Sequence, residues 1–158
     1  MALKKPKTKD EFFECECKTW DKLESLVAGL PKAVLTQPGA AGDWSVKDVW
    51  AHLADWMKET RRVMPMLLAG DQVPADIQSF NAEHYEKNRN LARDVARARL
   101  ERERQRVLAL FKKIPEEQLL NDNRVYVWTA FSTYNHYAEH IPALTQFRRV
   151  VMRKTRRA

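Results

Sequence analysis

The sequence predicts an all-α protein, folded as a four-helix bundle with a short extra helix between the second and third long helices. Apolar residues recur at steps of three, four and seven along four long segments, which is the spacing of one face of an α-helix. Only four glycines and seven prolines occur, too few for a turn-rich β-sandwich. Apart from the short stretch 124–128, no segment alternates with the period of a strand.

The first long helix is expected over about residues 8–30. Thr8 and Glu11 have the spacing of a capping box at its start, and Gly29 and Pro31 follow its last turn. Its expected inward face consists of Phe13, Trp20, Leu23, Val27 and Leu30.

The second long helix has the clearest amphipathic pattern in the chain. Ser45 and Asp48 form a second capping box, Pro65 is expected to kink the helix near its end, and Gly70 stops it. Its apolar positions are Val46, Val49, Trp50, Leu53, Trp56, Met57, Val63, Met64 and Leu67.

Two further long helices complete the expected bundle. After a linker at 71–75 and a short helix at 76–88, the third long helix is expected at 92–114, and the last at 127–152 with a bend at Pro142. The third helix turns Leu100, Val107, Phe111 and Ile114 inward. The last turns Phe131, Tyr134, Tyr137, Ile141, Leu144, Phe147 and Val151 inward.

The 158 residues predict a single domain, with a bundle core over about 8–147 and basic ends at 1–9 and 148–158. The net charge is +7, but ten Lys and Arg side chains lie in these two ends. The remainder holds 18 basic residues against 21 acidic ones. We therefore expect solvated, frayed ends rather than a nucleic-acid-binding stripe across the fold.

Neither a membrane span nor a signal peptide is visible. The longest uncharged apolar run falls well short of the ~20 residues that a span needs, and the N-terminal residues lack an apolar segment. The expected localisation is therefore cytoplasmic. Cys15 and Cys17 stand two residues apart on a predicted helix, so their side chains diverge and free thiols are expected.

Three of the four histidines have a spacing that suits a metal site. His136 and His140 stand at i and i+4 on the last helix, and His52 lies on the apolar side of the second helix. Three imidazoles from facing helices can bind zinc or nickel and leave one position open for water. The alternative is a set of hydrogen-bonded core histidines. His84 has no spacing partner and is expected at the surface.

Three stretches of the chain resemble a known family. Residues 44–56 read WSVKDVWAHLADW, residues 133–141 read TYNHYAEHI, and between them Asn81, Tyr85 and Asn88-Arg89 fit an N-x-x-x-Y-x-x-N-R pattern. In this order they resemble DinB-like four-helix-bundle proteins, closest to the ClbS/DfsB branch.

The resemblance implies an up-down-down-up bundle in which His52, His136 and His140 bind a divalent metal. Family members include thiol-dependent transferases and isomerases, and they often form homodimers. The branch contains a self-resistance protein that opens the reactive cyclopropane of a DNA-damaging metabolite. Met57 stands where the family commonly has Glu, and the basic C-terminal end lies outside the family pattern.

The helix faces predict a pocket at the histidine end of the bundle, covered by segment 71–90. Asp55 or Asp48 is expected to orient the His52 imidazole. Tyr85 is expected to supply a proton or a hydrogen bond to the substrate. The expected border of the pocket is His52, Trp56, Asn81, Tyr85, His136 and His140, with Trp56 and Asn81 against the substrate.

The histidines and the family resemblance together predict a metal-dependent hydrolase or transferase. The resemblance implies that it acts on a small electrophilic metabolite in detoxification or self-resistance. The first alternative is a binding protein that sequesters such a molecule without turnover. The second is a nucleic-acid-associated helical protein. It is disfavoured because no aromatic residue interleaves the basic end and no helix-turn-helix spacing is present. The expected partners are thus a small molecule and a second copy of the chain, with no membrane.

Overall fold

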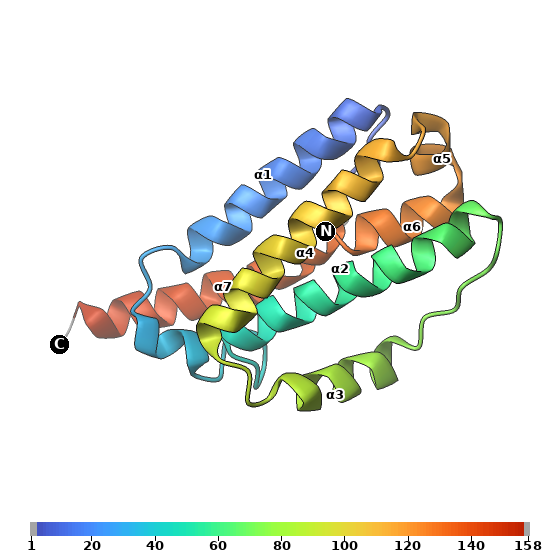
Figure 1. Cartoon of the computed structure of the whole chain (residues 1–158). Helices are drawn as coiled ribbons and strands as arrows, with labels where there is room; N and C mark the ends of the chain where they lie inside the picture. Colours follow the sequence, from blue (N-terminus) through green and yellow to red (C-terminus); the bar gives the residue numbers. More distant parts are fainter. Residues whose placement is uncertain (1–2, 157–158) are drawn as a thin grey trace.

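The computed structural model describes residues 3–156, in which the chain forms seven α-helices, one 3₁₀ helix and no β-strand (Figure 1). The all-α prediction is therefore confirmed. No helix in this range is both long enough and apolar enough to cross a membrane. The elements are α1 (Lys9–Val27), η1 (Lys32–Thr36), α2 (Val46–Leu68), α3 (Ile77–Asn88), α4 (Arg93–Lys113), α5 (Glu116–Asn121), α6 (Asn123–Phe131) and α7 (Tyr134–Thr155).

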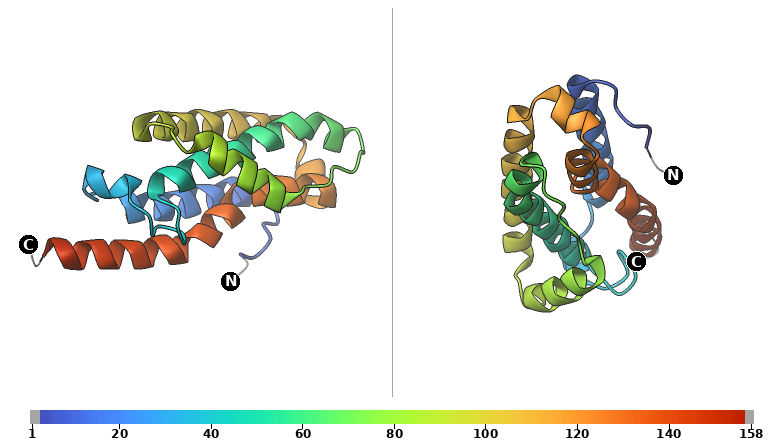
Figure 2. Two further views of the ribbon diagram at one scale, coloured as in Figure 1. Left: turned by 90° about the horizontal axis from the view of Figure 1, so that it is seen from below. Right: turned by 90° about the vertical axis from the view of Figure 1, so that its right-hand side faces the viewer.

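The four long helices α1, α2, α4 and α7 form the bundle. α2 packs mainly against α4, and α1 packs mainly against α7. The short helix α3 lies outside the bundle along α2, whereas α5 and α6 close one end (Figures 1 and 2). The extra helix between the second and third long helices is thus present as predicted.

The last helix differs from its prediction because the chain leaves helical geometry between α6 and α7. Thr133 has φ −129° and ψ −118°, and its side-chain hydroxyl donates to the Thr129 carbonyl at 2.6 Å. A hydroxyl that bonds the backbone four residues earlier competes with continued helix. The expected single helix over 127–152 is therefore two, and Pro142 lies inside an unbroken α7.

The buried face of α1 is rotated from the predicted one. Phe12 is completely buried and Phe13 only partly, because Glu16 also points inward. Its carboxylate accepts two hydrogen bonds from Arg104, at 2.8 and 2.7 Å, and one from the Tyr137 hydroxyl at 3.0 Å. A charge buried in this way needs such partners, and Arg104 is distant in sequence. Both cysteines are free, as expected.

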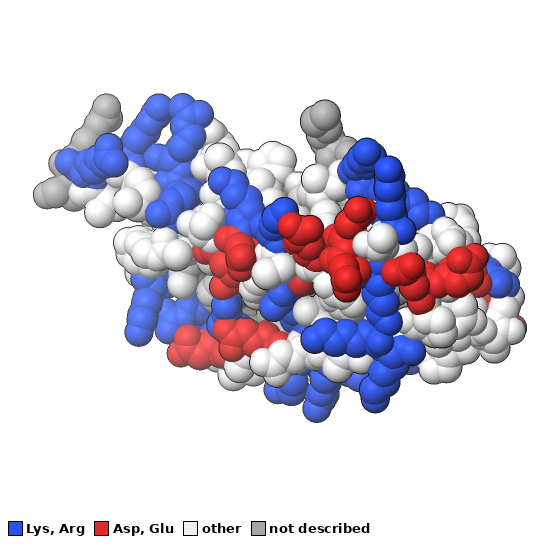
Figure 3. Space-filling model, turned by 90° about the horizontal axis from the view of Figure 1, so that it is seen from above, with Lys and Arg blue, Asp and Glu red and all other residues white. Residues whose placement is uncertain are grey.

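The expectation of frayed basic ends is wrong for most of the C-terminal end. α7 continues to Thr155, and Val151 is buried. Arg148 Nη1 donates to the carbonyls of Leu26 and Ala28, at 3.1 and 2.6 Å, and so caps the C-terminus of α1. Figure 3 shows basic side chains gathered where α7 ends, whereas acidic and basic side chains alternate along the middle of that face. Residues 1–2 and 157–158 of the two expected ends lie outside the described range.

Candidate functional site

The first turn of α2 sets the position of the site. Ser45 and Asp48 form the predicted capping box, with Ser45 Oγ accepting from the Asp48 amide and Asp48 Oδ2 accepting from the Ser45 amide. Before the cap, Gly39 and Gly42 take positive φ values of 111° and 62° in the loop that delivers Trp44. His52 follows on the inner side of α2.

The structure brings the three predicted histidines together. His52 Nε2 lies 2.8 Å from His136 Nε2, and one ring nitrogen from each of the three residues lies within 4.8 Å of the others. The break before α7 places His136 in its first turn and His140 one turn later. His136 is buried, and the other two rings are half-buried.

Burial keeps these imidazoles neutral. It lowers the pKa of His52 from 6.5 to about 3, with further lowering from neighbouring His140 and His84. Burial also lowers the pKa of His140 to about 4 and that of His136 well below its ordinary value. At neutral pH each ring therefore presents a nitrogen lone pair.

The donor set fits a transition-metal ion. Two ring nitrogens 2.8 Å apart can both reach an ion at the usual distance of about 2.1 Å. Within residues 3–156, His136 Nδ1 and His140 Nε2 are buried without a hydrogen-bond partner. Such atoms are rarely left unsatisfied in a native core. An all-imidazole site suits zinc or nickel rather than calcium or magnesium.

The predicted carboxylate partner of His52 is not formed. Asp55 accepts hydrogen bonds from Arg99 and from Asn88 Nδ2, the latter at 2.6 Å, and Asp48 is used by Ser45 and Lys47. Burial raises the pKa of Asp55, and Arg99 and Asn88 oppose this effect. Asp55 therefore links α2 to α3 and α4 rather than orienting an imidazole. Sequence spacing could not reveal this, because Arg99 lies 44 residues away.

The predicted open pocket is closed by aromatic packing. The ring of Trp44 stacks on Tyr85 at 5.5 Å and 7°, and it meets His52 edge-on at 4.8 Å. Trp56 Nε1 donates to Asn81 Oδ1 at 2.9 Å. The space left beside His52 is about 10 Å³, close to the volume of one water molecule. The predicted border residues therefore converge from α2, α3 and α7, and α3 covers them as the sequence predicted for segment 71–90.

Polar anchors hold α3 in this position. Asn88 is the one buried residue of α3, and its amide bonds both Asp55 and Arg99. The Lys47 ammonium donates to the carbonyls of Asn88 and Arg89, at 3.4 and 3.0 Å. Sequence analysis missed Lys47, because a lysine in the first turn of a helix usually faces solvent.

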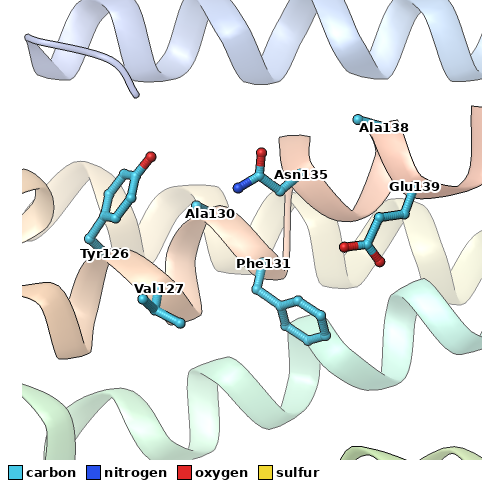
Figure 4. Close-up of a pocket in the computed structure, with 7 residues that line it drawn as sticks. All are labelled: Tyr126, Val127, Ala130, Phe131, Asn135, Ala138 and Glu139. Carbon is cyan, nitrogen blue, oxygen red and sulfur yellow. The ribbon is translucent and has the colours of Figure 1, made fainter. Parts of the chain in front are cut away.

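A second cavity, which the sequence did not predict, lies beside the break between α6 and α7. It has a volume of about 430 Å³ and is lined by Tyr126, Val127, Ala130, Phe131, Asn135, Ala138 and Glu139. In Figure 4, Phe131 and Glu139 point towards α2. Phe131 stacks on His136 at 5.0 Å and 12°, so its ring separates this cavity from the histidines. Burial raises the pKa of Glu139.

The family model of the DinB superfamily matches residues 18–141. The chain belongs to the DinB superfamily. The matched region holds all three clustered histidines and the whole of α3. A search of the curated proteins finds no match.

Several solved structures share the fold. The colibactin self-resistance protein ClbS, crystallised with a dsDNA, is 15% identical with a TM-score of 0.77, and the alignment covers 91% of this chain and 97% of ClbS. The sibling lethal factor precursor DfsB is 12% identical with a TM-score of 0.76, covering 92% and 97%. An uncharacterised Escherichia coli UTI89 protein is 18% identical with a TM-score of 0.73, covering 90% and 93%.

The two proteins that give the ClbS/DfsB branch its name are thus among these neighbours. At these identities the likeness concerns the fold alone. Because ClbS was crystallised with a dsDNA, the expectation that nucleic-acid binding is unlikely gains no support from the neighbours.

Proposed function

We propose that this protein is a metal-dependent hydrolase or transferase that acts on a small electrophilic metabolite, in resistance or detoxification. The observation that carries the proposal is the convergence of His52, His136 and His140. The Nε2 atoms of His52 and His136 lie 2.8 Å apart, and His140 Nε2 is buried without a partner within residues 3–156. The fold shared with the self-resistance protein ClbS supports the resistance class.

The three histidines would hold zinc or nickel. A bound divalent ion supplies Lewis acidity, which activates a water or thiol nucleophile and polarises an electrophile. The neutral imidazoles leave the charge of the ion uncompensated, which favours an anionic nucleophile. The surrounding rings of Trp44, Phe131 and Tyr85 exclude bulk water, and this strengthens electrostatic interactions at the site.

Tyr85 is the proposed proton donor. Its ring lies on Trp44, which itself contacts His52, and its hydroxyl makes no hydrogen bond to protein in the described part of the chain. That hydroxyl can therefore donate to an opening ring or a leaving group. Asn81 holds Trp56 through its amide oxygen, and the two form the proposed wall against the substrate. Asp55 keeps its partners Asn88 on α3 and Arg99 on α4, and its proposed role is to position α3 over the histidines.

The alternative with a specific observation in its favour is sequestration. The closed space beside His52 is too small for a metabolite, but with α3 opened its aromatic rings would hold an apolar molecule without any chemical step. Binding to DNA is a further alternative, because the fold neighbour ClbS was crystallised with a dsDNA. The homodimer that the family resemblance implies stays a prediction, which light scattering after size exclusion tests.

Product formation separates catalysis from sequestration. Zinc-loaded protein is incubated with 4-nitrophenyl acetate, for attack by water, and with 1-chloro-2,4-dinitrobenzene plus glutathione, for attack by a thiol. We expect metal-dependent product from one of them, and turnover about tenfold or more lower in Tyr85→Phe with little change in binding. Tyr126→Phe is the matched control, because Tyr126 bonds Tyr134 away from the histidines. Binding without product in both reactions would favour sequestration.

A further inference from the structure

A cationic cleft lies on the outer side of α2, between α3 and α4. Its volume is about 560 Å³, the largest of the cavities described here. Its wall carries five cationic side chains against two carboxylates, Asp55 and Glu59. The five are Lys58, Arg61, Arg62, Lys87 and Arg99. Glu103 and Glu83, just outside this wall, pair with Arg61 and Lys87, so the excess is one positive charge. In the body of the chain, by contrast, acidic residues outnumber basic ones outside the two ends.

Two of these arginines are held in place with donors to spare. Arg61 donates Nε and Nη2 to Glu103, at 3.2 and 2.7 Å, and Arg62 donates Nε and Nη2 to Glu59, at 2.8 and 2.6 Å. A guanidinium has five N–H groups, so each keeps Nη1 unused within residues 3–156. Arg61, whose side chain is 28% exposed, is held more firmly than Arg62, whose side chain is 63% exposed. Guanidinium groups with free N–H donors bind carboxylate and phosphate, often through two hydrogen bonds.

Lys58 adds a charge without a direct ion-pair partner, although it lies near enough to Asp55 to oppose burial, which raises the pKa of that carboxyl. It stands on α2 before Glu59, is exposed, and makes neither an ion pair nor a hydrogen bond among the described residues. The other four cations of the cleft each have a carboxylate partner. A ligand anion would therefore meet the Lys58 ammonium beside two guanidinium groups, of which Arg61 is held by the buried Glu103.

We propose that this cleft binds a small organic or inorganic anion through its carboxylate or phosphate group. The cleft adjoins the candidate metal centre, because Asp55, His84 and Asn88 line both the cleft and the small space beside His52. His84, expected at the surface, is half-buried in this shared wall. The cleft would select electrophilic metabolites that carry an acidic group. This inference about the substrate rests on the proposed function.

Isothermal titration with two probes, pyrophosphate and citrate, tests the cleft. The protein is first freed of metal and dialysed, and the salt is kept near ~20 mM to limit screening. We expect one of the probes to bind, and Lys58→Glu and Arg62→Gln to weaken it about tenfold or more, the effect of one lost charge-assisted hydrogen bond. Lys22→Glu, on the exposed side of α1, makes the same charge change as Lys58→Glu and should leave affinity within about twofold.

Because the titration uses metal-free protein, its result does not depend on the metal chemistry. Binding of pyrophosphate alone assigns a phosphate ligand, and binding of citrate alone a carboxylate ligand; either supports the proposal. Failure of both probes, or equal losses in Lys58→Glu and Lys22→Glu, would overturn it. So would a DNA duplex that binds at the cleft and is displaced by neither probe.

Discussion

Removing the Asn88 side chain should release α3 from the bundle without unfolding the bundle itself. Asn88 is the one buried residue of α3, and its amide joins the Asp55 carboxylate at 2.6 Å to the Arg99 guanidinium at 2.9 Å. Further attachments of α3 are the Lys47 contacts, the Trp56–Asn81 hydrogen bond, and the packing of Tyr85 and Phe80 on tryptophans.

The size of the effect follows from these two hydrogen bonds. Each involves a charged partner, for which the net contribution is about 1.5–3 kcal/mol. Asp55 and Arg99 keep each other in Asn88→Ala, and Arg99 lies at the edge of the open cleft, where solvent can reach it, so part of this loss is recovered. We therefore expect the free energy of opening α3 to fall by about 2–3 kcal/mol, roughly a 30- to 150-fold larger open population.

Hydrogen exchange measured by mass spectrometry gives this quantity directly. Peptides covering residues 77–88 should exchange roughly 30 to 150 times faster in Asn88→Ala, while peptides from α1 and α7 keep their protection. Asn90→Ala is the matched control, because Asn90 is exposed and its side chain makes no hydrogen bond among the described residues.

Two outcomes would refute the reasoning. Unchanged exchange over α3 would mean that the helix is held by its aromatic contacts rather than by Asn88. Equal acceleration in α1 and α7 would mean that α3 opens only when the whole bundle unfolds. Either result would also remove α3 as the separable cover of the histidine cluster.

Two further predictions concern stability. In metal-free protein the folded pKa values of His52 and His140, about 3 and about 4, lie below their ordinary 6.5, so the unfolded state binds more protons on acidification. Stability is therefore full above pH 6.5 and falls below it, by about 2 kcal/mol per histidine at pH 5. Urea unfolding at pH 7.5 and pH 5 measures this loss of unfolding free energy. His140→Gln should lose less than the wild type between the two pH values, and a loss equal to that of the wild type would contradict the prediction. Arg148→Ala, which uncaps the α1 carbonyls, should lower the melting temperature by about 2–6 °C in calorimetry. Arg149→Ala should leave the melting temperature unchanged, because the exposed Arg149 side chain has no partner among the described residues. Equal losses in both variants would mean that Arg148 stabilises the fold no more than a surface charge does.

Sequence spacing predicted the features that depend on residues only a few positions apart. The capping box at Ser45 begins α2 where expected, and Thr8 caps α1 although Glu11 accepts from the Lys7 amide instead of completing a box. The i, i+4 spacing of His136 and His140 places both rings toward His52. The break at Thr133 could not be predicted in the same way, because a threonine inside an apolar helical pattern gives no sign of which backbone carbonyl it will bond.

Long-range pairing explains the remaining differences. Asp55 stands one turn from His52, which suggested an imidazole partner, but Arg99 and Asn88 approach it from α4 and α3. Glu16 lies in the core because Arg104 and Tyr137, both distant in sequence, bond its carboxylate there. The closure of the site by Trp44 on Tyr85 depends on a loop and on α3, whose relative positions no periodicity encodes.

Metal binding by the histidine cluster is the central claim, and zinc stoichiometry tests it most directly. Protein purified without nickel resin is stripped, reconstituted with zinc, dialysed and measured by elemental analysis, alongside His136→Ala and the control His84→Ala. The account predicts one zinc per chain for the wild type and His84→Ala, little for His136→Ala, and nitrogen ligands near ~2.1 Å in X-ray absorption. Reconstituted wild type that retains no transition metal, or His136→Ala that retains as much as the wild type, would contradict it.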